Sequence, residues 1–340
     1  MLEKLFDSRK RYVVYGALAA AVAAAAFICL TCGRMPLSVS EVWGDIAAHL
    51  TGGDVDHNID LVVFSLRIPR ILLALFVGAG LACAGASYQS VFSNPLATPD
   101  TLGVASGAAV GAVVGLLLDF PMAIVHLSAF LAGLGATALT VMFARVQATM
   151  TITRLILSGV IVTSLMNATI SIVKLVADPA DQLPEITYWL MGGLTGATDT
   201  ALTYGGICIT VGIAGLMLLR WRLNILALSE EEARASGMRI APMRLAVIVL
   251  STLITASVVS ICGQVGWVGL VIPHCARLIC GSNNRFVIPT SVLLGALFMV
   301  VVDTAARSAL AMEIPLSILT AFIGAPVFVV LLRNTGRAVK

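Results

Sequence analysis

The chain has 340 residues, of which 59% are hydrophobic and only 11% are charged, and its formal net charge is +3. Soluble globular domains carry about 25% charged residues, so this composition excludes an ordinary soluble protein and indicates a polytopic membrane protein. The seven cysteines are scattered through apolar segments without a CxxC spacing, which predicts neither a metal site nor a disulfide framework.

Apolar runs predict nine or ten membrane spans, most of them long enough to cross a hydrocarbon core of about 30 Å. The first run follows Arg9-Lys10-Arg11 as a signal peptide would, but it lacks a convincing cleavage site and is kept as a span. The run at 268–280 is short and fits a half-helix as well as a full crossing. The predicted spans are 12–31, 66–88, 99–118, 121–143, 152–176, 198–219, 241–263, 268–280, 286–309 and 315–333.

Basic residues predict the orientation of these spans. With ten crossings and a cytoplasmic N-terminus, sixteen of the 21 basic residues lie on the cytoplasmic side, as the positive-inside rule requires. Both termini are therefore expected in the cytoplasm, together with the polar segment 224–240. Five basic residues break the rule, namely Arg34, Arg67, Arg70, Lys174 and Arg307.

The outer segments begin with the loop 33–62, whose first half alternates like an amphipathic helix lying along the membrane surface. Arg67 and Arg70 flank Pro69 at the outer mouth of the second span, and Arg307 lies near the outer end of the ninth. Snorkelling explains arginines at membrane ends, and an acceptor for carboxylates of a docking protein explains them equally well. Asp303, one turn before Arg307, is a competing partner for that guanidinium.

The third span carries glycines at every fourth position, which predicts a seam where another helix packs at backbone contact. These are Gly103, Gly107, Gly111 and Gly115. After the fifth span, the aromatic segment at about 180–194 indicates a short helix at the outer interface, near the mouth of any cavity, or an element of an aromatic belt.

The polar segment 224–240 separates two long apolar runs. Ser229 is placed as a helix N-cap, three glutamates follow in the first turn, and Arg234 lies four residues after Glu230. Gly237 supplies a left-handed stop. The pattern predicts a helix of about two turns outside the bilayer. This helix is either a solvated connector or a docking site for a partner protein.

Beyond the seventh span, glycines at positions 263, 266 and 269 allow a broken backbone. His274 and Arg277 follow, and on the predicted topology they fall toward the cytoplasmic side. An interhelical hydrogen bond or a contact with a nucleotide-binding subunit is expected of them rather than catalysis.

The sequence contains no GxxxxGK[ST], HExxH or GxSxG pattern, so neither a phosphate-binding loop nor these hydrolase sites are predicted. Ionisable residues in mid-membrane are scarce, which disfavours an ion-coupled transporter. These absences leave a pore without an energy source of its own. They indicate a transport subunit rather than an enzyme, with the energy supplied by a partner protein.

Taken together, these stretches resemble the FecCD family of ABC-importer permeases, which carry iron-siderophores, haem and cobalamin. The resemblance covers nearly the whole chain in order and spacing. The matching stretches are 67–70 (RIPR), Gln89, 94–97 (NPLA), 102–107 (LGVASG), 188–193 (YWLMGG), 230–234 (EEEAR), 268–274 (VGLVIPH), Arg277, Asp303, Arg307 and 324–328 (GAPVF).

The resemblance implies an all-α polytopic fold of the type II ABC importer permease class, with about ten transmembrane helices per subunit. Residues 1–340 would form one permease domain that pairs with a second copy of itself in the inner membrane of a prokaryotic cell. Two ABC ATPase subunits would bind below, using ATP and Mg, and a periplasmic or lipid-anchored binding protein above. The chain itself would bind no cofactor, metal or nucleic acid.

The resemblance also implies roles for particular residues. Arg67, Arg70 and Arg307 would receive acidic residues of the binding protein, and Ile152 and Thr153 would belong to the inner gate of the translocation pathway. The fifth and tenth spans would line that pathway. The helix that couples to the ATPase would comprise Ser229, Glu230, Glu231, Glu232, Ala233, Arg234 and Gly237.

The leading hypothesis is therefore the permease of an ATP-driven importer for a metal chelate, with an iron-siderophore as first choice. Haem and cobalamin are the alternatives within this class. An ion-coupled secondary transporter and a membrane scaffold without transport are the alternatives of other classes.

Overall fold

The computed structural model describes residues 8–53, 56–145, 151–196, 198–228, 230–310 and 312–337, and all regular structure in these ranges is helical. Seven helical stretches are long and apolar enough to cross a membrane, and three shorter apolar helices accompany them. The prediction of an all-α polytopic protein is confirmed. The ten apolar helices are α1 (Ser8–Thr31), α4 (Ile68–Val91), α5 (Val104–Leu117), α6 (Met122–Ala144), α7 (Ile152–Val176), α9 (Asp199–Leu226), α11 (Ile240–Cys262), α12 (Val268–Cys280), α13 (Asn284–Ser308) and α14 (Leu316–Arg337).

Helix α4 is the central element of the bundle, and α9, α11, α12 and α13 pack around it. All residues from position 77 to position 91 are buried. Glycines allow this density, because a Cβ placed on Gly78 would lie 2.0 Å from the carbonyl oxygen of Gly295 in α13. A Cβ on Gly85 would lie equally close to the carbonyl oxygen of Gly269 in α12. Helices α12 and α13 therefore contact α4 backbone to backbone. Small residues allow such close packing of helices in membranes.

The predicted glycine seam is confirmed for three of its four members. Gly107, Gly111 and Gly115 all face α6, and a Cβ on Gly111 would lie 2.3 Å from the carbonyl oxygen of Ser128. Gly103 does not belong to the seam. It has φ +78° and ends the 3₁₀ turn η3 (Pro99–Leu102), where it lies against α7. The left-handed backbone is the reason for a glycine at this position.

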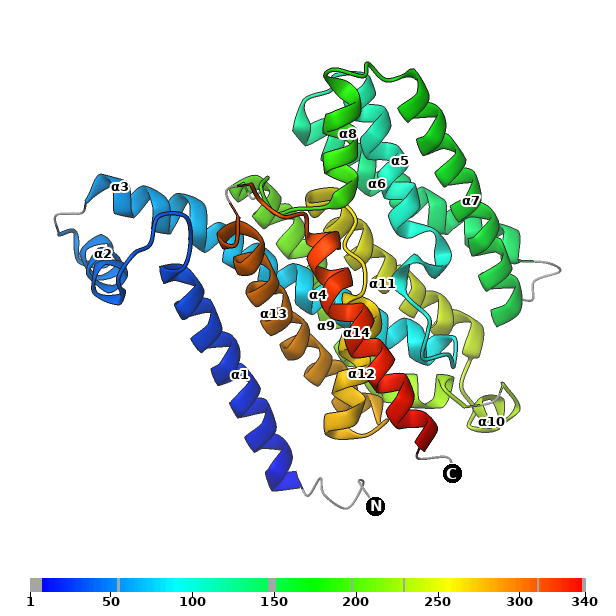
Figure 1. Cartoon of the computed structure of the whole chain (residues 1–340). Coiled ribbons are helices and arrows are strands. Elements are labelled where there is room, and N and C mark those ends of the chain that lie inside the picture. The colour runs from blue at the N-terminus through cyan, green and yellow to red at the C-terminus, as the bar shows by residue number, and fades with distance from the viewer. Residues whose placement is uncertain are drawn as a thin grey trace.

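The surface helices lie at opposite ends of the bundle (Figure 1). The short helix α10 (Glu230–Ala235) lies at the same end as the start of α1 and the end of α14. At the other end are α2 (Val39–Thr51), α3 (His57–Asp60) and α8 (Gln182–Met191). The polar segment 224–240 and the loop 33–62 are thus separated by the length of the spans, as the charge pattern predicted.

The second span is longer than the hydropathy pattern predicted. Helix α3, the π-helical segment η2 (Leu61–Arg67) and α4 form one stretch of 35 residues, from His57 to Val91.

Helix α12 is too short to cross the membrane. It has 13 residues and is about 20 Å long at 1.5 Å per residue, which is less than the thickness of a hydrocarbon core. The non-helical segment 263–267 precedes it, with positive φ at Gly263 and Trp267, and confirms the predicted broken backbone.

Candidate coupling and docking sites

Helix α10 presents a polar face outside the bundle. Glu231, Glu232 and Arg234 are exposed, whereas Ala233 is 2% exposed and anchors the helix. Gly237 has φ +77°, and its amide donates to the carbonyl of Arg234 at 2.9 Å, which confirms the predicted left-handed stop. Ser229 and the side chain of Glu230 lie outside the described residues.

The buried side of α10 faces a cavity of about 280 Å³. Ala233 lines this cavity together with Ile152, the first residue of α7. The structure therefore brings the predicted coupling helix and one of the two predicted gate residues together. Thr153, the other gate residue, is exposed and does not line this cavity. The complete lining is Ser93, Ile152, Leu226, Ala227, Leu228, Ala233, Ile240 and Arg244.

At the opposite end, the three predicted docking arginines lie near one another, and each is largely engaged inside the protein. Arg67 is 4% exposed and donates to the backbone carbonyls of Leu30 and Met35, at the end of α1 and just beyond it. Arg307 is 8% exposed and donates to the carbonyl of Cys29 at 2.7 Å. These contacts attach α1 to the end of η2, just before α4, and to α13.

Arg70 lies between two carboxylates. Its Nη2 is 2.9 Å from Asp303 Oδ1 and 3.0 Å from Glu313 Oε2, and Nη1 donates to Glu313 Oε1 at 3.0 Å. The predicted pairing of Asp303 with Arg307 is present, at 3.8 Å. Two of the three arginines are thus paired with two carboxylates, so this end carries less free positive charge than the sequence suggested. The docking role of the arginines stays a prediction.

Removing the shared carboxylate is expected to destabilise the protein strongly. Asp303→Ala leaves Arg70 and Arg307 buried with fewer partners, and breaking a buried pair in this way costs roughly 3–5 kcal/mol. Glu313→Gln is the matched control, because Glu313 is partly exposed and its loss should cost no more than about 1 kcal/mol. Thermal unfolding of the detergent-solubilised variants measures the difference, and equal unfolding temperatures would contradict this assignment.

The predicted interhelical bond of Arg277 is confirmed, because its Nη1 donates to Gln89 Oε1 in α4. His274 has no hydrogen-bond partner for Nδ1 among the described residues and packs edge-on against Phe328 of α14, with ring centroids 6.1 Å apart.

Sequence reasoning missed Asp100 and Glu313. Asp100 is an exposed carboxylate in η3, beside the middle turns of α4 and α7, and no described group donates to it. Asp100 lies in a short polar turn, and the sequence alone does not show that this turn is at the depth of the membrane. Irregular backbone and an ionisable group at that depth indicate a water-accessible space.

An all-helical bundle of apolar spans, with a polar helix exposed at one end, defines the class of multi-pass membrane proteins. Residues 21–334 match the FecCD transport family, and the chain belongs to this family. It is the permease of an ABC importer.

Three similar proteins illustrate the range of the family. The molybdate import system permease protein MolB of Haemophilus influenzae is 40% identical over 92% of this chain and 93% of its own length. The cobalamin import system permease protein BtuC of Halobacterium salinarum is 38% identical over 82% of this chain and 75% of its own. A solved structure described as a metal-chelate type ABC transporter in an inward-facing conformation is 38% identical, with a TM-score of 0.86 over 94% of this chain and 99% of that one.

Proposed function

We propose that this chain is the permease subunit of an ATP-driven importer that takes up a metal chelate, with an iron-siderophore as the first candidate. Two copies form the membrane core in the inner membrane of a prokaryotic cell, with both termini in the cytoplasm. Two ATPase subunits, which use ATP and Mg, bind at the α10 end, and a binding protein docks at the end of α2 and α8. The structural similarity to the metal-chelate type transporter supports this proposal.

The observation that carries the coupling mechanism is the cavity shared by α10 and α7. Because Ala233 and Ile152 line the same space, a displacement of α10 by the ATPase would change the shape of this cavity at the start of α7. Small shifts between packed elements are converted into discrete rearrangements, since cores are not continuously deformable. ATP opens or closes the gate only because the assembly binds ATP with different affinities in its two arrangements of packed helices.

The exposed face of α7 supports a pathway for a large, weakly held cargo. Thr153, Val160, Ser164, Asn167 and Ser171 form an exposed stripe along one side of the helix, in which every residue but Val160 is polar and none is charged. The hydroxyls of Ser164 and Ser171 donate to carbonyls of their own helix, at 2.8 and 2.9 Å. Few donors remain for tight contacts, so cargo moving along this stripe would not be held strongly.

Molybdate is a second candidate cargo, favoured by the 40% identity with the molybdate permease. Reconstitution decides between the two. Proteoliposomes that hold the permease with its ATPase and binding protein should accumulate radiolabelled ferric siderophore in an ATP-dependent manner, and not molybdate. Accumulation of molybdate but not of ferric siderophore would instead identify molybdate as the cargo. Uptake by the permease alone in an ion gradient would overturn the proposed class.

Docking of a carboxylate from the binding protein on Arg70 requires that Glu313 leave it, because both Nη atoms contact Glu313. Glu313→Gln is therefore expected to strengthen binding about two- to five-fold, since a partly exposed ion pair contributes roughly 0.5–1 kcal/mol. Surface-captured binding protein titrated with the two permease variants measures the ratio of Kd values. An unchanged or weaker affinity for the Glu313→Gln variant would show that Arg70 does not bind the docking protein.

A further inference from the structure

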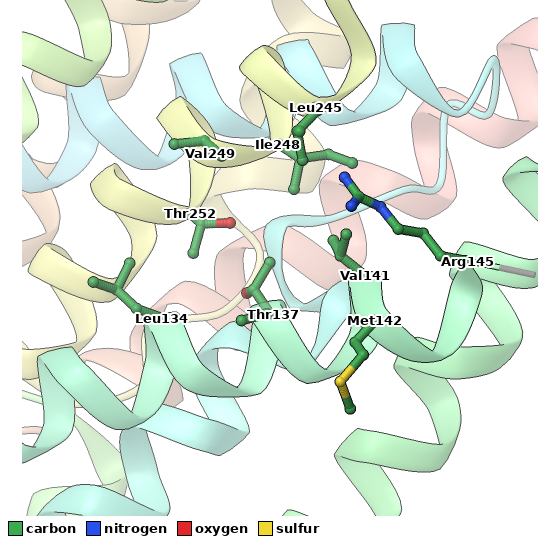
Figure 2. Close-up of a pocket in the computed structure, with 10 residues that line it drawn as sticks. Leu134, Thr137, Val141, Met142, Arg145, Leu245, Ile248, Val249 and Thr252 are labelled. Carbon is green, nitrogen blue, oxygen red and sulfur yellow. The ribbon is translucent and has the colours of Figure 1, made fainter. Parts of the chain in front are cut away.

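A groove of about 580 Å³ runs between α6 and α11, away from the coupling and docking sites (Figure 2). Leu134 and Val141 of α6 face Ile248 and Val249 of α11 across it, and Met142 lies at its edge. Met142 is 57% exposed and Val249 is 55% exposed, so the groove opens on the outside of the bundle. The complete lining is Leu134, Thr137, Ala138, Val141, Met142, Arg145, Leu245, Ile248, Val249 and Thr252.

The walls of the groove are almost entirely apolar. The hydroxyls of Thr137 and Thr252 are engaged elsewhere, the first with the carbonyl of Gly133 at 3.4 Å and the second with the Tyr88 hydroxyl at 3.4 Å. The remaining polar group is the guanidinium of Arg145, which reaches back over the groove toward Ile248 (Figure 2). No carboxylate or carbonyl within the described ranges pairs with that guanidinium.

Arg145 marks the end of the groove that lies at the membrane boundary. It directly follows the last residue of α6, and the groove continues from it along two membrane-spanning helices. Leu245, beside it in the lining, belongs to the first turns of α11, which begin shortly after α10. The groove thus combines an apolar slot within the hydrocarbon with one cation where headgroups lie.

We propose that this groove binds one anionic glycerophospholipid, with an acyl chain between α6 and α11 and the phosphate on Arg145. An apolar slot at this depth is in contact with lipid tails, and a guanidinium binds phosphate oxygens with two parallel hydrogen bonds. One basic residue near the surface favours an anionic headgroup over a neutral one about five-fold. The occupant is a structural lipid that holds α6 against α11 beside the start of α7.

Native mass spectrometry of the purified permease, exchanged into nanodiscs of equal phosphatidylglycerol and phosphatidylcholine, tests this site. The wild type should retain phosphatidylglycerol about five-fold over its share of the nanodisc lipid. Arg145→Gln should bring the ratio close to one. Arg222→Gln is the matched control, because Arg222 is an exposed basic residue near the same end of the bundle but on α9, outside the groove.

A second variant tests the slot without changing the charge. Ala138 is exposed and lines the groove, so Ala138→Trp should fill it and abolish retention of the lipid while Arg145 is intact. The thermal unfolding profile of each variant in detergent shows that its fold is preserved. Retention that persists in Arg145→Gln or in Ala138→Trp, or a wild type without enrichment, would overturn the proposal.

Discussion

Replacing Gly78 by valine is expected to remove most of the correctly folded protein from the membrane. The new Cβ would lie 2.0 Å from the carbonyl oxygen of Gly295 and 2.7 Å from the Cβ of Met299, so α4 and α13 must move apart. Overpacking in a dense core usually costs roughly 1–3 kcal/mol, and contact with backbone leaves no side chain that can rotate away. The loss should therefore exceed that range, because α4 is the helix on which the bundle is built.

The measurement is the yield of monodisperse protein after detergent extraction, together with its unfolding temperature. Gly135→Val is the matched control, since Gly135 lies in α6 with no atom within 4 Å of an added Cβ. It should cost only the small helix penalty of a β-branched residue. A Gly78→Val protein that extracts and unfolds like the wild type would show that α4 and α13 are not in backbone contact.

Replacing both Glu231 and Arg234 by alanine is expected to lower ATP-dependent uptake about ten-fold while leaving the fold intact. Both side chains are exposed, and surface substitutions usually change stability by no more than about 0.5 kcal/mol. A ten-fold loss corresponds to about 1.4 kcal/mol of coupling free energy between the ATPase and the gate. Uptake and ATP hydrolysis are measured in the same proteoliposomes, so that uncoupling is distinguished from failed assembly.

Leu131→Ala is the control for this pair, because Leu131 is an exposed residue in the middle of α6, away from both α10 and the end at which α2 and α8 lie. Its uptake should equal that of the wild type. Wild-type uptake in the Glu231 and Arg234 double variant would contradict the coupling role of α10.

The spans could be predicted where the sequence marks their ends. The predicted runs 152–176 and 268–280 coincide with α7 and α12, because Thr151 caps the first helix and Gly281, with φ +77°, ends the second. The helical continuity from His57 to Val91 was not predicted. Polar residues at 56–60 suggest a loop, and π-helical hydrogen bonding leaves no sequence pattern that hydropathy detects.

The local structure of the candidate coupling helix could be predicted from the sequence, but the packing of the candidate docking arginines could not. The exposed charges of α10 and the stop at Gly237 follow from local rules of helix termini. The burial of Arg67 does not, because its partners are carbonyls some thirty residues earlier in the chain. The pairing of Arg70 with both Asp303 and Glu313 likewise depends on tertiary contacts across more than two hundred residues.

That separation has a consequence for biogenesis. Arg70 is inserted 233 residues before Asp303 and 243 before Glu313 are synthesised, so during translation its charge has neither carboxylate beside it. The ion pairs that join the start of α4 to the end of α13 therefore form only after most of the chain has been synthesised. A nascent chain arrested before Asp303 would leave the guanidinium of Arg70 without either carboxylate at the start of α4.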